Sequence, residues 1–231
     1  MTFPDPVPSL ASPTSEAPAD DLPRGTALAS FIAAKLCHDF ISPAGAIVSG
    51  MDLLRDPAAQ DMRDDALGLI EASAGKLVSI VNFARVAFGA ATTAERFDAA
   101  ELEKLVRDDF GHMRAQLAWD VPVPVFEKPA ARALLNLAHL GGAALPMGGT
   151  ATIGVRPDDA GGVVMTADAR GPRARLKPEV LTGLKGEALT EGLAGQWIQG
   201  FWLSEVVREA GGTLSVETAE ETVVITARIP A

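Results

Sequence analysis

The stretch KLCHDFISP (residues 35–43) lies at the centre of a long apolar repeat. Across residues 26–55 the apolar side chains recur at helical spacing, within one sector about 100° wide that is typical of an amphipathic helix. They are Ile32, Leu36, Phe40, Ile47, Met51 and Leu54. A proline inside a helix usually kinks or ends it, but the repeat resumes in the same sector beyond Pro43. The stretch therefore predicts one kinked helix rather than two.

A second helical pattern follows over residues 61–89, after a break at Asp56-Pro57. Its apolar stripe consists of Ile70, Leu77, Val81, Ala84 and Phe88. Two antiparallel helices with a short connection make a hairpin, and one hairpin alone buries little apolar surface. We therefore expect residues 25–90 to form a helical hairpin that pairs with a second copy, giving a homodimer with a four-helix bundle.

Beyond a linker at residues 90–95 the pattern changes to alternating helices and strands. Helical patterns cover residues 97–118, 132–145 and 196–210. Extended runs cover residues 121–127, 150–156, 162–167, 213–217 and 222–229, and the prolines in the first of these suggest a sheet edge. Residues 96–231 are therefore predicted to form an α+β domain, with a mixed sheet and helices on one face.

Composition places bounds on the class of protein. Residues 1–24 are rich in Pro, Ala and Ser without an apolar period, which predicts a disordered tail rather than a signal peptide. No later segment approaches the roughly 18–20 uninterrupted apolar residues of a membrane span. The single cysteine, Cys37, excludes an internal disulfide, and the net charge of −10 argues against broad nucleic-acid binding. A cytoplasmic protein is expected.

His38 is the candidate functional residue. Helical arithmetic places it on the side of the helix opposite the apolar stripe, so it should point outward. Its neighbours on that side are mostly small: Phe31, Ala34, Ser42, Gly45 and Ser49. Another protein's active site could therefore approach this histidine.

The chemistry of this face suits phosphoryl transfer. A neutral imidazole nitrogen is a good nucleophile near pH 7. Asp39 could accept a hydrogen bond from the other ring nitrogen and stabilise the charge that develops on the ring. From the residues alone, simpler interpretations stay open: a surface histidine for His38, a solvated charge for Asp39 and a local hydrogen-bonding role for Ser42.

Other polar or reactive residues have simpler interpretations. His112 and His139 have no carboxylate at ligand spacing in the sequence and are expected to be structural. Cys37 falls beside the apolar sector and is expected to be buried. The basic cluster Arg170, Arg173 and Arg175 is interpreted as a solvated loop, with contact to a receiver domain as the alternative.

The spacing His38-Asp39-x-x-Ser42-Pro43 resembles the phosphoacceptor motif of sensor histidine kinases, which reads His-Glu/Asp-x-x-Thr/Asn-Pro. From Phe97-Asp98 onward the chain is similar to the ATP-binding domain of those kinases. Residues 133–137 and 146–150 look like the helix and loop of the asparagine box, and residues 209–214 look like the end of the last helix and the next strand.

The ATP-binding elements depart from the kinase pattern. The Mg²⁺-binding asparagine falls at Leu140, whose aliphatic side chain cannot ligate Mg²⁺. Asp168 aligns with the adenine-reading aspartate, but the glycines expected after it are replaced. Trp197 and Ile198 stand where the phosphate-binding glycines are expected and should block close backbone approach to phosphate.

An intact histidine motif with degraded ATP boxes resembles the dimeric histidine phosphotransferases of the alphaproteobacterial cell-cycle phosphorelay, the ChpT type, from about Ala27 to the C-terminus. The resemblance implies a dimeric four-helix bundle followed by a histidine-kinase ATPase-like α/β sandwich that lacks ATP binding. It also implies that the chain shuttles a phosphoryl group through His38 between receiver domains of a hybrid histidine kinase and of response regulators. The chain is expected to have no cofactor or metal of its own and to bind neither nucleic acid nor a membrane. The partner receiver is expected to supply Mg²⁺.

Roles are assigned on this basis. His38 is the expected phosphoacceptor, Asp39 its orienting or basic neighbour, and Ser42 a residue that positions water or tunes dephosphorylation. The receiver is expected to dock on the surface formed by Phe31, Ala34, Ile41 and Gly45. Two alternatives remain: an active ATP-dependent histidine kinase, and a non-catalytic scaffold that binds receivers.

Overall fold

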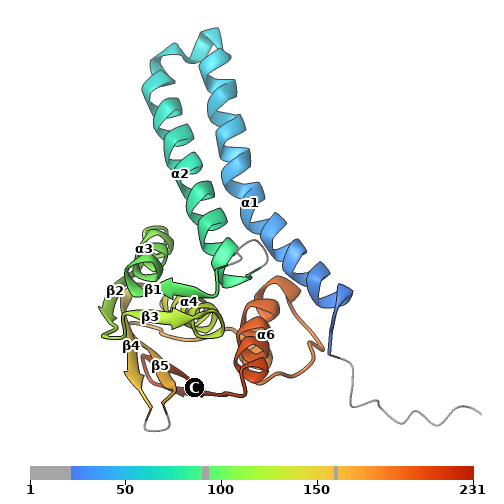
Figure 1. Cartoon of the computed structure of the whole chain (residues 1–231). Coiled ribbons are helices and arrows are strands. Elements are labelled where there is room, and N and C mark those ends of the chain that lie inside the picture. Colours follow the sequence, from blue (N-terminus) through green and yellow to red (C-terminus); the bar gives the residue numbers. More distant parts are fainter. Residues whose placement is uncertain (1–21, 90–93, 159–160) are drawn as a thin grey trace, which may run out of the picture.

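The computed structural model describes residues 22–89, 94–158 and 161–231. A long helical hairpin stands on an α+β domain (Figure 1). The hairpin consists of α1 (Thr26–Arg55), the short 3₁₀ helix η1 (Pro57–Met62) and α2 (Arg63–Ala87). Both long helices lie where the apolar repeats predict them, and α1 runs unbroken through Pro43.

The two hairpin helices approach closely at Gly50. A Cβ atom added there would lie 2.7 Å from Ile70 Cγ1 and 3.0 Å from the carbonyl oxygen of Ala66. Gly50 and Pro43 are the two buried residues of α1. A small residue at this position therefore lets α1 pack against the backbone of α2.

The outer surface of the hairpin stays apolar in the single chain. Ile41 is 69% exposed, and Val48 and Val78 are each 59% exposed. Met51 and Val81, which belong to the predicted stripes, are also exposed. One hairpin therefore leaves part of its apolar stripe uncovered, as the sequence suggests.

The hairpin helices are also apolar enough to meet a length-and-composition test for membrane spans. The segments Thr26–Arg55 and Pro57–Ala87 each reach a mean hydropathy of 1.3. Core helices of soluble proteins pass the same test. The test therefore does not separate a membrane span from a helix that packs against other helices.

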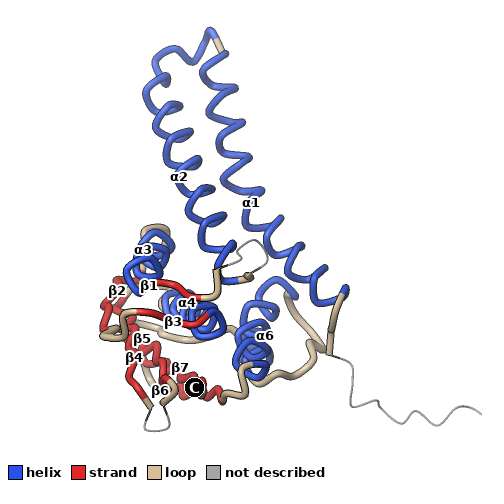
Figure 2. The backbone as a smooth tube through the Cα atoms, viewed as in Figure 1, coloured by secondary structure: helices blue, strands red, loops and turns tan. Residues whose placement is uncertain are grey.

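The second domain contains four helices and seven strands within the described residues (Figure 2). Its elements are β1 (Arg96–Asp98), α3 (Ala99–Phe110), β2 (Ala115–Asp120), β3 (Val125–Glu127), α4 (Lys128–Ala143), β4 (Gly149–Pro157), β5 (Val163–Arg170), α5 (Pro178–Leu184), α6 (Ala194–Glu209), β6 (Thr213–Ala219) and β7 (Thr222–Ile229).

The main sheet has the order β2-β4-β5-β7-β6. The strands β2 and β4 pair in parallel, and the other neighbours pair antiparallel, so the predicted mixed sheet is confirmed. A separate antiparallel pair joins β1 to β3. Residues on one face of β4, β5 and β7 are buried alternately along each strand, as expected where helices cover that face.

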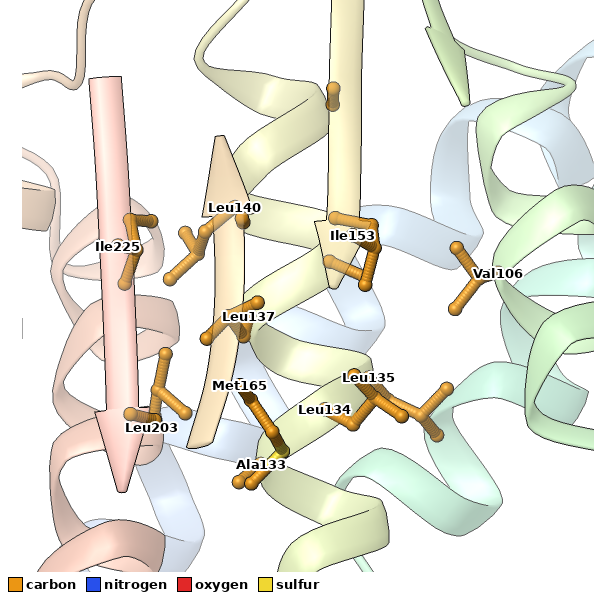
Figure 3. Close-up of a cluster of buried hydrophobic side chains, with 14 of the residues drawn as sticks. Val106, Ala133, Leu134, Leu135, Leu137, Leu140, Ile153, Met165, Leu203 and Ile225 are labelled. Carbon is orange, nitrogen blue, oxygen red and sulfur yellow. The ribbon is translucent and has the colours of Figure 1, made fainter. Parts of the chain in front are cut away.

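Helix α4 provides the centre of the core. Leu137 and Leu140 point from α4 toward the sheet, where Ile153, Met165 and Ile225 come from three neighbouring strands (Figure 3). All five side chains are at most 2% exposed. This packing holds one face of α4 against the sheet, and other faces of α4 contact α2 and α6.

The helix predicted over residues 97–118 is wrong at both ends. Phe97 lies in β1, the helix α3 ends at Phe110, and Ala115–Asp120 forms the edge strand β2. The residues Ala, Gln and Leu of β2 favour helices, but their backbone pairs with β4 across the fold. A pairing distant in sequence therefore overrides the local preference. The extended run at residues 121–127 forms a strand only at its end, and the helix α5 was not predicted.

Most of the tail predicted over residues 1–24 lies outside the described residues, as does most of the predicted linker. Of the last tail residues, Leu22 packs beside the buried cluster of Trp197, Ile198 and Phe201. That cluster belongs to α6 and also contacts the start of α1. The first turns of α1 therefore rest on the second domain.

Candidate functional site

His38 lies on α1 where the hairpin faces the second domain. Its side chain is 85% exposed, which confirms the outward direction expected from helical arithmetic. It nevertheless lines two cavities, each shared with residues of the second domain. The histidine is thus accessible from solvent and borders both parts of the molecule.

Asp39 joins two neighbours on α1. Its Oδ1 lies 3.4 Å from His38 Nδ1, and its Oδ2 accepts a hydrogen bond from Lys35 Nζ at 2.7 Å. The Lys35 side chain is 12% exposed and the Asp39 side chain 30% exposed. The carboxylate is therefore held by Lys35 beside the ring, and Nδ1 is the nitrogen that faces it.

Pro43 shapes the backbone beneath this group. A proline has no N–H, so the carbonyl of the residue four positions earlier, Asp39, loses its usual helical partner. Ser42 is exposed and lines the same cavity as His38. Within the described residues Ser42 makes no side-chain hydrogen bond. The local role expected for Ser42 at the proline is therefore not seen.

The first cavity has a volume of about 340 Å³ and separates the hairpin from the second domain. The hairpin contributes His38, Asp39, Ser42, Lys76 and Phe83, among others. The second domain contributes Asp109, His112, Met113, His139 and Gln199. Polar groups from α1, α2, α3, α4 and α6 thus converge on one space beside the histidine.

The second cavity, of about 380 Å³, lies between α1 and the start of α6. Phe31, Ala34 and His38 line it from α1, and residues 193–196 line it from the second domain. Leu193 is 62% exposed at its rim. This cavity extends the surface around His38 onto α6.

His139 has a partner that the sequence spacing conceals. Its Nδ1 lies 2.9 Å from Asp109 Oδ2, and its ring lies 5.7 Å from that of Phe83 on α2. This contact agrees with the structural role expected for His139, although the sequence spacing gave no sign of the carboxylate. The carboxylate comes from another helix, 30 positions away. No local sequence pattern predicts this pairing.

The four expected docking residues differ in accessibility. Ala34, Ile41 and Gly45 are exposed, and a Cβ added at Gly45 meets no atom within 4 Å. Phe31 is half-buried, because its ring packs edge-on against Trp197 with the centroids 5.5 Å apart. Phe31 thus joins α1 to α6 and presents only part of its ring to a partner.

The structure places further residues that the sequence analysis singled out. Trp197 and Ile198 lie inside α6 with side chains at most 1% exposed, so they fill the core instead of obstructing a loop. Leu140 is buried at 2% exposure. Cys37, expected to be buried, is exposed because α2 does not cover that face of α1 in the single chain.

Asp168 is engaged by a neighbouring cation. Arg170 donates to both of its carboxylate oxygens, from Nε at 3.0 Å and from Nη2 at 2.9 Å. The hydrogen bonds and the charge of Asp168 raise the pKa of Arg170. The carboxylate that aligns with the adenine-reading aspartate is therefore ion-paired. Across the described parts of the chain, no group of three or more His, Cys, Asp or Glu residues is arranged to hold a metal ion.

Comparison with known proteins identifies the family. A family model described as the C-terminal domain of histidine phosphotransferases matches residues 99–222, more than half of the chain. The protein phosphotransferase ChpT of Brucella abortus (strain 2308) is 29% identical over 202 residues, which cover 87% of this chain and 94% of that protein. A solved bacterial phosphotransferase matches with a TM-score of 0.78 at 27% identity, over 90% of this chain and all of that chain. The chain belongs to the histidine phosphotransferase family.

Proposed function

We propose that His38 carries a phosphoryl group between receiver-domain aspartates in a two-component phosphorelay. The observation that carries this proposal is the exposed imidazole of His38, held beside the Asp39 carboxylate, in a chain of this family. No other histidine among the described residues combines such exposure with a carboxylate on its own helix. His139 has its carboxylate partner, but its side chain is only 26% exposed.

The geometry suits a defined transfer step. When the Nδ1 proton of His38 points to Asp39, the lone pair of Nε2 faces solvent and can attack phosphorus. A bond from Nε2 to phosphorus forms as the bond from phosphorus to the aspartyl oxygen of the receiver breaks, and the aspartate leaves as a carboxylate. The ring gains positive charge, which Asp39 stabilises. Transfer to the next receiver reverses these steps.

The partner provides the remaining chemistry in this proposal. A receiver brings the Mg²⁺ and cationic groups that neutralise the phosphoryl oxygens. The proposed carrier therefore has no cofactor of its own. The pairing of Asp168 with Arg170 and the burial of Leu140 support a second domain that does not use ATP.

We propose that two chains assemble through their hairpins into a four-helix bundle. The exposed apolar residues Val48 and Val78 support this, because a second hairpin would cover such a surface. His38 faces the second domain, so bundle formation is compatible with access to the histidine. The assembly is proposed to be cytoplasmic and to bind no nucleic acid.

Receiver docking is proposed on the face of α1 around His38. Ala34, Ile41 and Gly45 form its accessible part, with the exposed edge of Phe31 and the adjoining rim of α6. Small residues here let a partner helix approach the histidine. Ser42 borders the reacting atoms and is proposed to influence the loss of the phosphoryl group to water.

The test is phosphotransfer profiling. The full chain is incubated with each receiver domain of its source organism, phosphorylated beforehand with labelled acetyl phosphate. Label should move to the wild-type chain and should not move to a His38→Ala variant. Label that stays on every receiver, or that His38→Ala still accepts, would overturn the proposal.

A second incubation with labelled ATP separates the alternatives. An active kinase would label itself without any receiver, and the label would disappear in His38→Ala. A scaffold would bind receivers yet carry no label under either condition. Only label acquired from receivers, and none from ATP, agrees with the proposed carrier.

A further inference from the structure

The C-terminal end of α2 is held by side chains of the second domain. The carbonyl oxygen of Ala87, the last residue of α2, accepts hydrogen bonds from Asn136 Nδ2 at 3.0 Å and Trp202 Nε1 at 2.8 Å. Arg132 adds a bond from Nη2 to the carbonyl of Gly89 at 2.9 Å. A helix end leaves such carbonyls without intrahelical partners. We call Arg132, Asn136 and Trp202 the α2 clamp.

Asn136 is the centre of this clamp. Its side chain is fully buried, its Nδ2 also donates to the Arg132 carbonyl at 2.8 Å, and its Oδ1 accepts from Gln199 Nε2 at 2.7 Å. Carbonyl oxygens can only accept, so the nitrogen of the amide must face Ala87 and Arg132. The amide therefore has a single orientation, in which it ties α2, α4 and α6 together.

Arg132 packs against the chain just beyond α2. Gly89 has a φ of +69°, and a Cβ added there would lie 1.8 Å from Arg132 Nη2. Within the described residues, Arg132 Nε is buried without a hydrogen-bond partner, which is unfavourable. The guanidinium is thus packed over Gly89, where a side chain would leave no room for it.

The two helices that carry the clamp also face His38. On α4, His139 follows Asn136 by one turn and lines the first cavity. On α6, Gln199 lines the first cavity, and Gln196, one turn earlier, lines the second. The contact of Phe31 with Trp197 gives a second fixed point on α1. The clamp therefore sets where these faces lie relative to the histidine.

We propose that Asn136 is a positioning residue for phosphoryl transfer. By closing the α2 clamp it holds α4 and α6 in register with His38, so that a receiver meets the hairpin and the second domain as one prepared surface. This inference rests on the proposed function of His38. If the clamp opens, only a fraction of the molecules holds the hairpin and the second domain in the arrangement that binds the receiver. The apparent dissociation constant for the receiver is then the intrinsic constant divided by that fraction. The chemistry at His38 after docking is unaffected.

The test compares two substitutions in the same helix. Asn136→Leu removes the donor to the Ala87 carbonyl and the acceptor of the Gln199 amide. Gln199 lines the first cavity, so its freed amide can turn toward that space. Leu137→Ala is the matched control, because it weakens the core next to Asn136 without touching the clamp. Each full-length variant is phosphorylated at His38 with phosphoramidate, which loses ammonia as its phosphorus bonds to the ring. Single-turnover transfer is then followed against increasing concentrations of the receiver found by profiling.

The expected result is a split between affinity and rate. Asn136→Leu should raise the half-saturating receiver concentration about tenfold and keep the maximal rate within about twofold. Trp202→Phe, which removes the other donor to Ala87, should show a smaller rise in the same concentration. Leu137→Ala should lower the melting temperature and leave that concentration unchanged. An unchanged half-saturating concentration in Asn136→Leu, or an equal rise in Leu137→Ala, would overturn the proposal.

Amide hydrogen exchange measures whether the α2 clamp is closed and does not require a phosphorylated protein. In Asn136→Leu, amides of residues 84–89 should exchange faster than in the wild type, while those near the tip of the hairpin stay unchanged. Unchanged exchange at residues 84–89 would also overturn the clamp. If wild-type His38 accepts no phosphoryl group, the proposed function fails, and this measurement still reports on the clamp by itself.

Discussion

Replacing Asp39 with asparagine tests how far its charge assists transfer. The substitution keeps the size of the side chain and removes the negative charge 3.4 Å from His38 Nδ1. Two unit charges at that separation interact by about 1 kcal/mol in water and about 5 kcal/mol at an effective dielectric constant of about 20. Because His38 is 85% exposed, the lower end of this range applies. Lys35, 2.7 Å from the other carboxylate oxygen, reduces the effect further.

We therefore expect Asp39→Asn to slow transfer onto His38 by about three- to fivefold. The assay is single-turnover transfer of label from a phosphorylated receiver, at saturating receiver, followed by quenching and gel separation. Asp52→Asn is the matched control, since Asp52 lies on the same helix and its Oδ1 lies 3.7 Å from Arg55 Nη1. The control should transfer at the wild-type rate.

Two outcomes would refute this electrostatic reasoning. A rate within twofold of the wild type would mean that Asp39 contributes no useful charge. A loss greater than about a hundredfold would exceed what an exposed charge at this distance supplies, and would assign Asp39 a direct role in moving a proton.

Three further predictions concern the hairpin. Gly45→Trp should slow transfer at least tenfold, because the indole would block one contact with the receiver. The circular-dichroism spectrum should stay unchanged, because the space around Gly45 is open. A wild-type transfer rate would exclude this docking surface. Val48→Glu should shift the sedimentation coefficient from dimer to monomer, because it places a charge in the proposed bundle; an unchanged coefficient would place the interface elsewhere. Gly50→Leu should lower stability by about 1–3 kcal/mol in urea unfolding, since a Cβ already meets Ile70 at 2.7 Å. Gly45→Leu is its control and should not destabilise.

The two long helices and the direction of His38 follow from the sequence alone. Helical periodicity depends on local geometry. Once the apolar stripe is located, the residues on the opposite side of the helix, His38 among them, are therefore known. The strands β4 to β7 were also predictable, because alternation and turn residues mark them locally. The strand β2 was not, since its helix-favouring residues adopt an extended form only through pairing with β4.

The motif from His38 to Pro43 could be recognised in the sequence, whereas the residues of the second domain that lie around it could not. The spacing from His38 to Pro43 lies within two turns of one helix, so sequence order and spatial order coincide there. The pairing of His139 with Asp109 and the bonds of the α2 clamp to the end of α2 join residues that are 30 to 115 positions apart. The cavities beside His38 join α1 to α6, which lies near the other end of the chain. Such contacts depend on how α3, α4 and α6 pack against the hairpin, which no local pattern encodes.

Asn136 illustrates the difference most clearly. By sequence it is a polar residue in a helix that looks like part of a kinase asparagine box, and nothing nearby indicates a partner. In the fold it is fully buried and joins α2 to α6. The sequence by itself determined the helices and the outward direction of His38, because periodicity and a short motif are local. Only the tertiary structure decided how the second domain stands against that histidine, because buried hydrogen bonds between distant helices set that arrangement.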